Sequence, residues 1–188
     1  MHFKDIPQFT PDGNYEINVV LRDLERTIDD YIANYDLELN PDFQRGNVWT
    51  KQQQIAWLEF FFKGGKTSRV VYFNCPEWAL NPAPDSDIKN MCCVDGLQRL
   101  TALLGFLHNE IPVFGCYFKD FENRLGHDYW IRININSLQY RKDVLKWYLD
   151  MNSDGTVHSD TELDRVKKLY DETSHLKTIN DMDVLTYA

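Results

Sequence analysis

Apolar residues recur at helical spacing in two segments of the first half of the chain. Across residues 21–35 they occupy every third or fourth position, with acidic residues and arginines between them. A second helix is predicted to begin after Thr50, because Gln53 follows three residues later and completes a capping-box pattern. The Gly64-Gly65 pair is predicted to end this helix.

Runs of β-branched and aromatic residues predict short strands, which are Tyr15–Val20, Arg69–Asn74, Met91–Val94, Val113–Phe118 and Trp130–Ile135. Further helices are predicted over Leu97–His108, over Leu138–Met151 and from an opening at Ser159–Glu162. Residues 76–90 contain three prolines and several acids, which indicates an exposed loop. Strands and helices that alternate without a regular rhythm favour an α+β fold.

The composition is that of a folded domain of ordinary size. The chain has 188 residues, of which 43% are hydrophobic and 14% aromatic, and this excludes a disordered linker. Acidic residues number 29 against 20 basic ones, giving a net charge of −9. This balance argues against a dedicated electrostatic binder of bare duplex DNA, because such a binder normally carries a basic face.

Nothing in the sequence predicts a membrane protein. The longest apolar stretches, residues 55–62 and 100–107, are too short to span a bilayer, and no secretory signal begins the chain. We therefore expect a cytoplasmic protein. Its cysteines lack a C-x-x-C pair and are predicted to be buried, reduced thiols: Cys75, Cys92, Cys93 and Cys116.

Residues 64–68 resemble the end of a phosphate-binding P-loop, but the match is incomplete. Phe60 stands where the motif requires a glycine, and a predicted helix precedes the segment where the motif requires a strand. A helix C-cap is the better interpretation of the glycines. Lys66 and Arg69 are still expected to add positive charge near a pocket.

Two short segments combine charged, amide and aromatic side chains. They are residues 42–49 and residues 94–100, and the second lies where a buried strand is predicted to turn into a helix. Such a turn directs free N–H groups at one point, where the helix dipole favours an anion. Arg45 and Arg99 could each hold a phosphate, and Asp95 could hold Mg²⁺ or a ribose hydroxyl. A structural alternative is open, in which Asp95 only caps the helix and pairs with Arg99.

The two segments together resemble the N-terminal domain of GmrSD-type restriction proteins, within the ParB/sulfiredoxin-like superfamily. The resemblance is carried by Phe43-Gln44-Arg45 with Val48-Trp49, and by Val94-Asp95-Gly96-Leu97-Gln98-Arg99-Leu100-Thr101. Phe43 and Asp95 are separated by 52 positions, close to the spacing in the family. Leu97 replaces the first glutamine of the commoner Asp-Gly-Gln-Gln-Arg motif. Residues 145–155 are similar to a turn in short, phage-encoded, stand-alone members.

The resemblance implies a ParB/sulfiredoxin-like nucleotide-binding domain over residues 1–125. Residues 126–188 would form a strand and a helical extension packed on the same domain. The implied ligand is a nucleoside triphosphate (NTP) with Mg²⁺, held by Phe43, Gln44, Arg45, Asp95, Gly96, Gln98, Arg99 and Thr101. Within that set the metal would be held by Asp95, and any hydrolysis would depend on Asp95, Gln98, Arg99 and Gln44.

Three functions follow, in decreasing order of support from the sequence. The first is a nucleotide-binding regulatory protein of a restriction system, with possible slow NTP hydrolysis. The second is a non-catalytic interaction protein, for example a phage accessory factor in the host cytoplasm that binds a host defence or nuclease protein. The third, a nuclease acting on DNA directly, is disfavoured by the acidic composition and by the lack of a recognisable His-Asn-His constellation.

Overall fold

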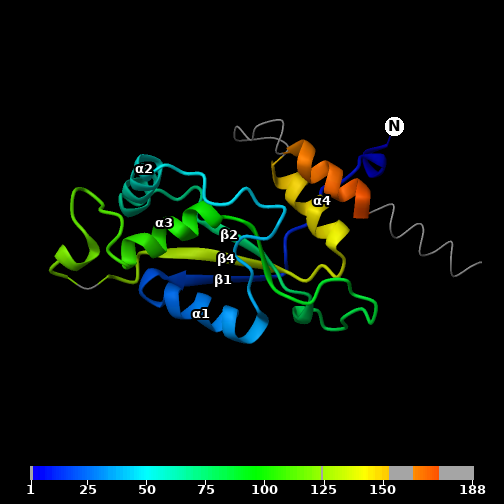
Figure 1. Cartoon of the computed structure of the whole chain (residues 1–188), viewed down its shortest axis with the longest axis horizontal. Coiled ribbons are helices and arrows are strands. Elements are labelled where there is room, and N and C mark those ends of the chain that lie inside the picture. Colours follow the sequence, from blue (N-terminus) through cyan, green and yellow to red (C-terminus); the bar gives the residue numbers. More distant parts are fainter. Residues whose placement is uncertain (1, 124, 153–162, 174–188) are drawn as a thin grey trace, which may run out of the picture.

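The fold is built on a four-stranded mixed sheet with the strand order β1-β4-β2-β3 (Figure 1). The computed structural model describes residues 2–123, 125–152 and 163–173. The strands are β1 (Tyr15–Val20), β2 (Val70–Asn74), β3 (Cys92–Asp95) and β4 (Trp130–Asn136). β4 pairs antiparallel with β1 and parallel with β2, and β2 pairs antiparallel with β3. The sequence suggested a division of the chain after residue 125. β4 follows that position and lies between β1 and β2, which precede it, so residues from both parts form one sheet.

Helices complete the α+β fold that the sequence predicts. They are α1 (Leu24–Tyr35), α2 (Lys51–Phe62), α3 (Leu97–Leu107) and α4 (Arg141–Asn152), and residues 163–173 are also helical. Single 3₁₀ turns cover Phe3–Asp5, Leu21–Asp23, Pro76–Trp78 and Phe118–Asp120.

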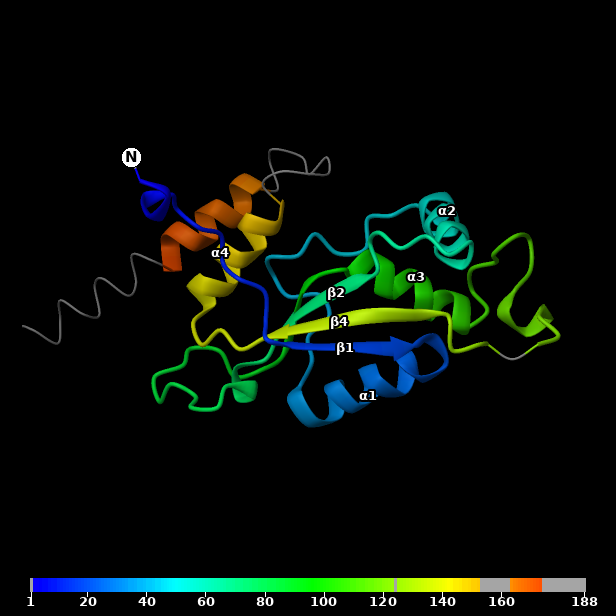
Figure 2. The same cartoon turned by 180° about the vertical axis from the view of Figure 1, so that it is seen from behind.

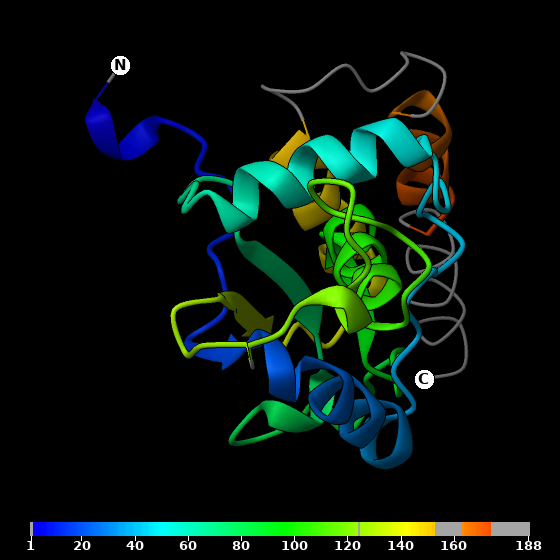
Figure 3. The ribbon, with the colours of Figure 1, turned by 90° about the vertical axis from the view of Figure 1, so that its left-hand side faces the viewer.

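The main core lies on one face of the sheet, beneath α1 and α3. Ile131, Ile133 and Ile135 alternate along β4 and are buried in this core, whereas Arg132 on the opposite face pairs with Glu16. α2 contacts α3 and runs across it at the top of the view in Figure 3. Seen from behind, β1 and β4 lie unobstructed in front of the helices (Figure 2). The period-two alternation of apolar side chains along β4 therefore decides which face α1 and α3 cover.

A second, smaller core holds α4 and the helix of residues 163–173 at one end of the sheet. Trp147 and Tyr148 of α4 are buried there against Phe43 and against Cys92 and Val94 of β3. This packing brings the C-terminal turn of α4 beside the turn that links β3 to α3.

The structure confirms most predicted elements but corrects the strand expected over Val113–Phe118. Val113 and Cys116 instead exchange backbone hydrogen bonds of 2.8 and 3.0 Å within one tight turn. Phe114 and Gly115 adopt left-handed backbone angles in that turn, with φ of 52° and 77°. Although the composition of the segment favours a strand, the chain reverses before it can pair with the sheet. The predicted opening of the last helix at 159–162 lies outside the described residues.

The ends of α2 form as predicted, but Arg69 has a different role from the one expected. Thr50 and Gln53 form the capping box, and Gly64 follows the helix with a φ of 88°. Arg69 does not add charge to a pocket: it is buried and donates to the carbonyls of Phe61 (2.8 Å) and Gly65, at the C-terminal end of α2. Burial lowers the pKa of its guanidinium.

All four cysteines are free thiols, and three of them are buried as predicted. Cys116 is the exception, because it lies in the exposed turn described above. Burial raises the pKa of Cys75 to about 11 and that of Cys92 to about 12, and it raises the pKa of Cys93 well above the usual value. These thiols are therefore protonated as well as shielded at neutral pH.

We expect iodoacetamide at pH 8 to alkylate Cys116 first in the native protein, and peptide mass spectrometry identifies the site. The other three cysteines should react at a comparable rate only after denaturation with guanidinium. Rapid native labelling of Cys75, Cys92 or Cys93 would contradict the burial described here.

Candidate functional site

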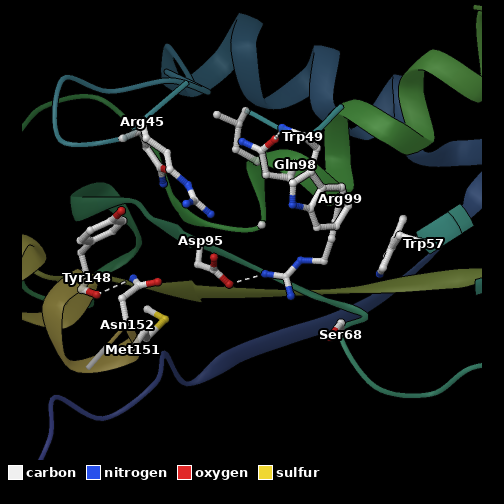
Figure 4. Close-up of a pocket in the computed structure, with 13 residues that line it drawn as sticks. Arg45, Trp49, Trp57, Ser68, Asp95, Gln98, Arg99, Tyr148, Met151 and Asn152 are labelled. Carbon is white, nitrogen blue, oxygen red and sulfur yellow. Dashed lines mark hydrogen bonds and ion pairs between the residues drawn. The ribbon is translucent and has the colours of Figure 1, made fainter. Parts of the chain in front are cut away.

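A cavity of about 290 Å³ opens where the N-terminus of α3 meets residues 44–49 and the end of α4 (Figure 4). It is lined by the two sequence motifs and by residues of three other segments. The lining residues are Gln44, Arg45, Trp49, Trp57, Ser68, Asp95, Gly96, Leu97, Gln98, Arg99, Tyr148, Met151 and Asn152.

The N-terminus of α3 faces this cavity without a side-chain cap. Gly96 occupies the N-cap position with a φ of 104°, and it has no side chain that could accept a hydrogen bond from the first turn. A Cβ at this position would approach Val71 to 3.0 Å, so close packing on β2 also requires glycine. The uncapped first turn presents partial positive charge to whatever occupies the cavity.

The side-chain amide of Gln98 ties the two motifs together. Its Oε1 accepts hydrogen bonds from the backbone N–H groups of Val48 (3.1 Å) and Trp49 (2.9 Å). Its Nε2 donates to the carbonyl of Gly46. One amide on α3 therefore sets the path of a loop about fifty residues earlier in the chain.

Gln44 makes the reciprocal connection, from the first motif to β3. Its Nε2 donates to the carbonyls of Cys93 (3.2 Å) and Val94 (2.7 Å). Both glutamines were expected to contact a nucleotide. In the structure they line the cavity, but their amide nitrogens are bonded to backbone carbonyls.

Asp95 and Arg99 form an ion pair across the first turn of α3, as the structural alternative requires. Both side chains also line the cavity, so the ion pair is part of its wall. Arg45 reaches toward the same region from the opposite side (Figure 4). Among the described lining residues, two guanidinium groups and one carboxylate lie beside the helix N-terminus. The arrangement suits an anion.

Phe43 and Thr101 are placed away from the cavity. Phe43 is buried in the second core, with its ring 5.5 Å from that of Tyr148. The hydroxyl of Thr101 donates to the carbonyl of Leu97 within α3. Arg165 donates to three successive backbone carbonyls, from Asp42 to Gln44, and so braces the first motif from the C-terminal helix.

Seven lining residues were not predicted as site residues from the sequence: Trp49, Trp57, Ser68, Leu97, Tyr148, Met151 and Asn152. Trp49 lies inside the first motif, so proximity in sequence could have indicated it. Tyr148 and Asn152 come from α4, and only the packing of the second core brings them to α3. The Nε1 of Trp57 is buried and has no hydrogen-bond partner within the described residues.

The family assignment follows from a match that spans both motifs and α4. A family model described as the N-terminal domain of GmrSD restriction endonuclease matches residues 24–181. This chain belongs to that family. The assignment associates the GmrSD_N domain with restriction systems, in agreement with the resemblance noted in the sequence. No curated protein and no solved structure matches the chain.

Two negative findings apply to the described part of this GmrSD_N domain. Within residues 2–123, 125–152 and 163–173, no group of three or more His, Cys, Asp or Glu side chains could hold a metal ion. No helix in those residues is long and apolar enough to cross a membrane. Asp95 is the only carboxylate among the described lining residues of the cavity.

Replacing Gln98 with Leu should release the loop of residues 46–49. We expect faster hydrogen exchange of the Val48 and Trp49 amides, and a loss of about 1–3 kcal/mol in the free energy of unfolding, because three hydrogen bonds are removed, two of them partly buried. Exchange followed by NMR and urea unfolding measure the two effects. Gln8→Leu is the control, since that exposed amide donates locally to the carbonyl of Ile6. Unchanged exchange at Val48 and Trp49 would show that Gln98 does not position the loop.

Proposed function

We propose that this GmrSD_N domain binds a nucleoside triphosphate together with Mg²⁺, and that the bound nucleotide regulates a restriction activity. The observation that carries the proposal is the uncapped N-terminus of α3, flanked by Arg45 and Arg99 inside one cavity. Backbone N–H groups and guanidinium groups that converge in this way are suited to phosphate oxygens. The nuclease function would come from another domain or protein.

The ion pair between Asp95 and Arg99 explains why a metal would assist binding. A triphosphate that approaches Arg99 also meets the carboxylate of Asp95, which repels it. Mg²⁺ takes oxygen ligands and commonly combines one or two carboxylates with phosphate oxygens and water. Asp95 fits as its protein ligand, and the ion would neutralise part of the phosphate charge. Arg99 would then turn from Asp95 to the phosphates.

The hydrogen bonds of Gln44 and Gln98 favour a role in shaping the binding site over a role in hydrolysis. The Gln98 amide makes three hydrogen bonds to the loop, so orienting a water molecule would cost it those bonds. We therefore assign Gln98 and Gln44 to positioning the cavity wall, and Arg45, Arg99 and Asp95 to the ligand.

Arg99→Ala should lower the affinity for Mg²⁺–NTP about tenfold or more, because a charge-assisted hydrogen bond to phosphate is lost. Calorimetric titration with ATP, GTP, CTP and UTP, with Mg²⁺ and with EDTA, measures the effect. EDTA should weaken the binding by the wild-type protein.

Arg132→Ala is the matched control for this titration. Arg132 is also an ion-paired arginine, but its partner is Glu16 and it does not line the cavity. It should leave nucleotide affinity unchanged. If no nucleotide binds to the wild-type protein, the proposal is wrong and the non-catalytic interaction protein becomes the better function.

A further inference from the structure

The end of the cavity formed by α4 differs in chemistry from the end formed by α3. Tyr148, Met151 and Asn152 line it, and none of these side chains carries a charge at neutral pH. At the α3 end, Arg45, Arg99 and the helix N-terminus favour an anion. A nucleotide has the same polarity, with charge on its phosphates and a neutral heterocycle at its other end.

The amide of Asn152 has a defined orientation. Its Nδ2 donates to the carbonyl of Tyr148 at 2.7 Å. Because a carbonyl only accepts hydrogen bonds, the nitrogen must face it, and Oδ1 must point the other way. In Figure 4 this oxygen lies on the side that faces Asp95 and the middle of the cavity. Asn152 therefore presents a hydrogen-bond acceptor to a ligand.

The second core holds this acceptor in place. Trp147, one helical turn before Met151, is 1% exposed, and Tyr148 is 2% exposed. Both are packed in the cluster that includes Phe43 of the first motif. A side chain supported by such packing keeps its position relative to α3, which is what selection between similar ligands requires.

We propose that the α4 end of the cavity is the nucleobase subsite, and that Asn152 Oδ1 accepts a hydrogen bond from an N–H group at the edge of the base. The thioether of Met151 packs on the ring. This inference rests on the proposed function, since it assigns the base of the same triphosphate. The opposite end, near Trp57 and Ser68, is the less suitable place, because the indole Nε1 of Trp57 is buried and Ser68 is exposed.

The experiment compares five ligands in the presence of Mg²⁺: ATP, GTP, CTP, UTP and inorganic triphosphate. Bases differ in where their edges carry N–H groups, so the wild-type protein should prefer the best base over the worst by about tenfold, as expected for a specific base contact. Asn152→Ala should bring the four nucleotide affinities together and leave the affinity for inorganic triphosphate unchanged. Asn152→Leu, which retains volume at this position, should do the same.

Asn34→Ala is the matched control. Asn34 makes the same local bond in α1, from Nδ2 to the carbonyl of Asp30 at 2.8 Å, and it does not line the cavity. It should keep the wild-type order of affinities, and thermal unfolding confirms that each variant is folded.

The outcomes separate this inference from the function on which it rests. Equal binding of all four nucleotides by the wild-type protein overturns the base subsite but leaves phosphate binding intact. If Asn152→Ala lowers the affinity for inorganic triphosphate as much as the affinity for the nucleotides, the base subsite is also overturned. Asn152 would then act on the phosphates or on the fold. If Trp49→Leu abolishes the base preference and Asn152→Ala does not, the base binds at the end near Trp57 and Ser68, and the inference is wrong. If neither triphosphate nor nucleotides bind, both proposals fail.

Discussion

The hydrogen bonds of one side chain, Gln98, hold the site of this GmrSD_N domain together. Its amide joins α3 to a loop that has no regular structure of its own, through Gly46, Val48 and Trp49. Each bond contributes only about 1 kcal/mol net. Their importance is geometric, because they keep Arg45 and Trp49 on the wall of the cavity instead of free in solvent. Gln44 adds a second tie to β3, so the two motifs define one rigid frame.

The sheet supplies the fixed reference for this frame. β3 ends at Asp95, Gly96 turns the chain, and α3 begins immediately afterwards. The turn can be this tight only because Gly96 tolerates a positive φ and lies against Val71 of β2. The helix N-terminus is thus placed directly beside a central strand, and the charged residues of the second motif cannot move far from it.

The ion pair of Asp95 with Arg99 shows that structural and functional interpretations of a motif can both hold. A carboxylate four residues before an arginine stabilises the first turn of a helix in any protein. In this one the pair also forms the cavity wall, where its two members favour opposite partners, a cation and an anion. Under the proposed function, Mg²⁺ with a triphosphate would bring both, and it would replace the internal ion pair with two interactions to the ligand.

Local sequence was sufficient for those features that depend on short-range interactions. The capping box of Thr50 and Gln53, the glycine C-cap of α2 and the alternation along β4 all involve residues within a few positions of each other. The expectation that the two motifs lie together also came from the sequence, and five polar or charged residues of the motifs line one cavity: Gln44, Arg45, Asp95, Gln98 and Arg99.

Only the tertiary structure decided how those residues are used. Residue type could not show that the amides of Gln44 and Gln98 are bonded to the backbone, or that Phe43 is buried in a second core, since each depends on partners far away in the chain. The turn at Val113 and Cys116 was missed for a similar reason, because strand propensity is decided by available pairing edges. Asn152 lines the cavity because α4 packs in the second core. That packing is a long-range effect, and no sequence pattern near Asn152 indicates it.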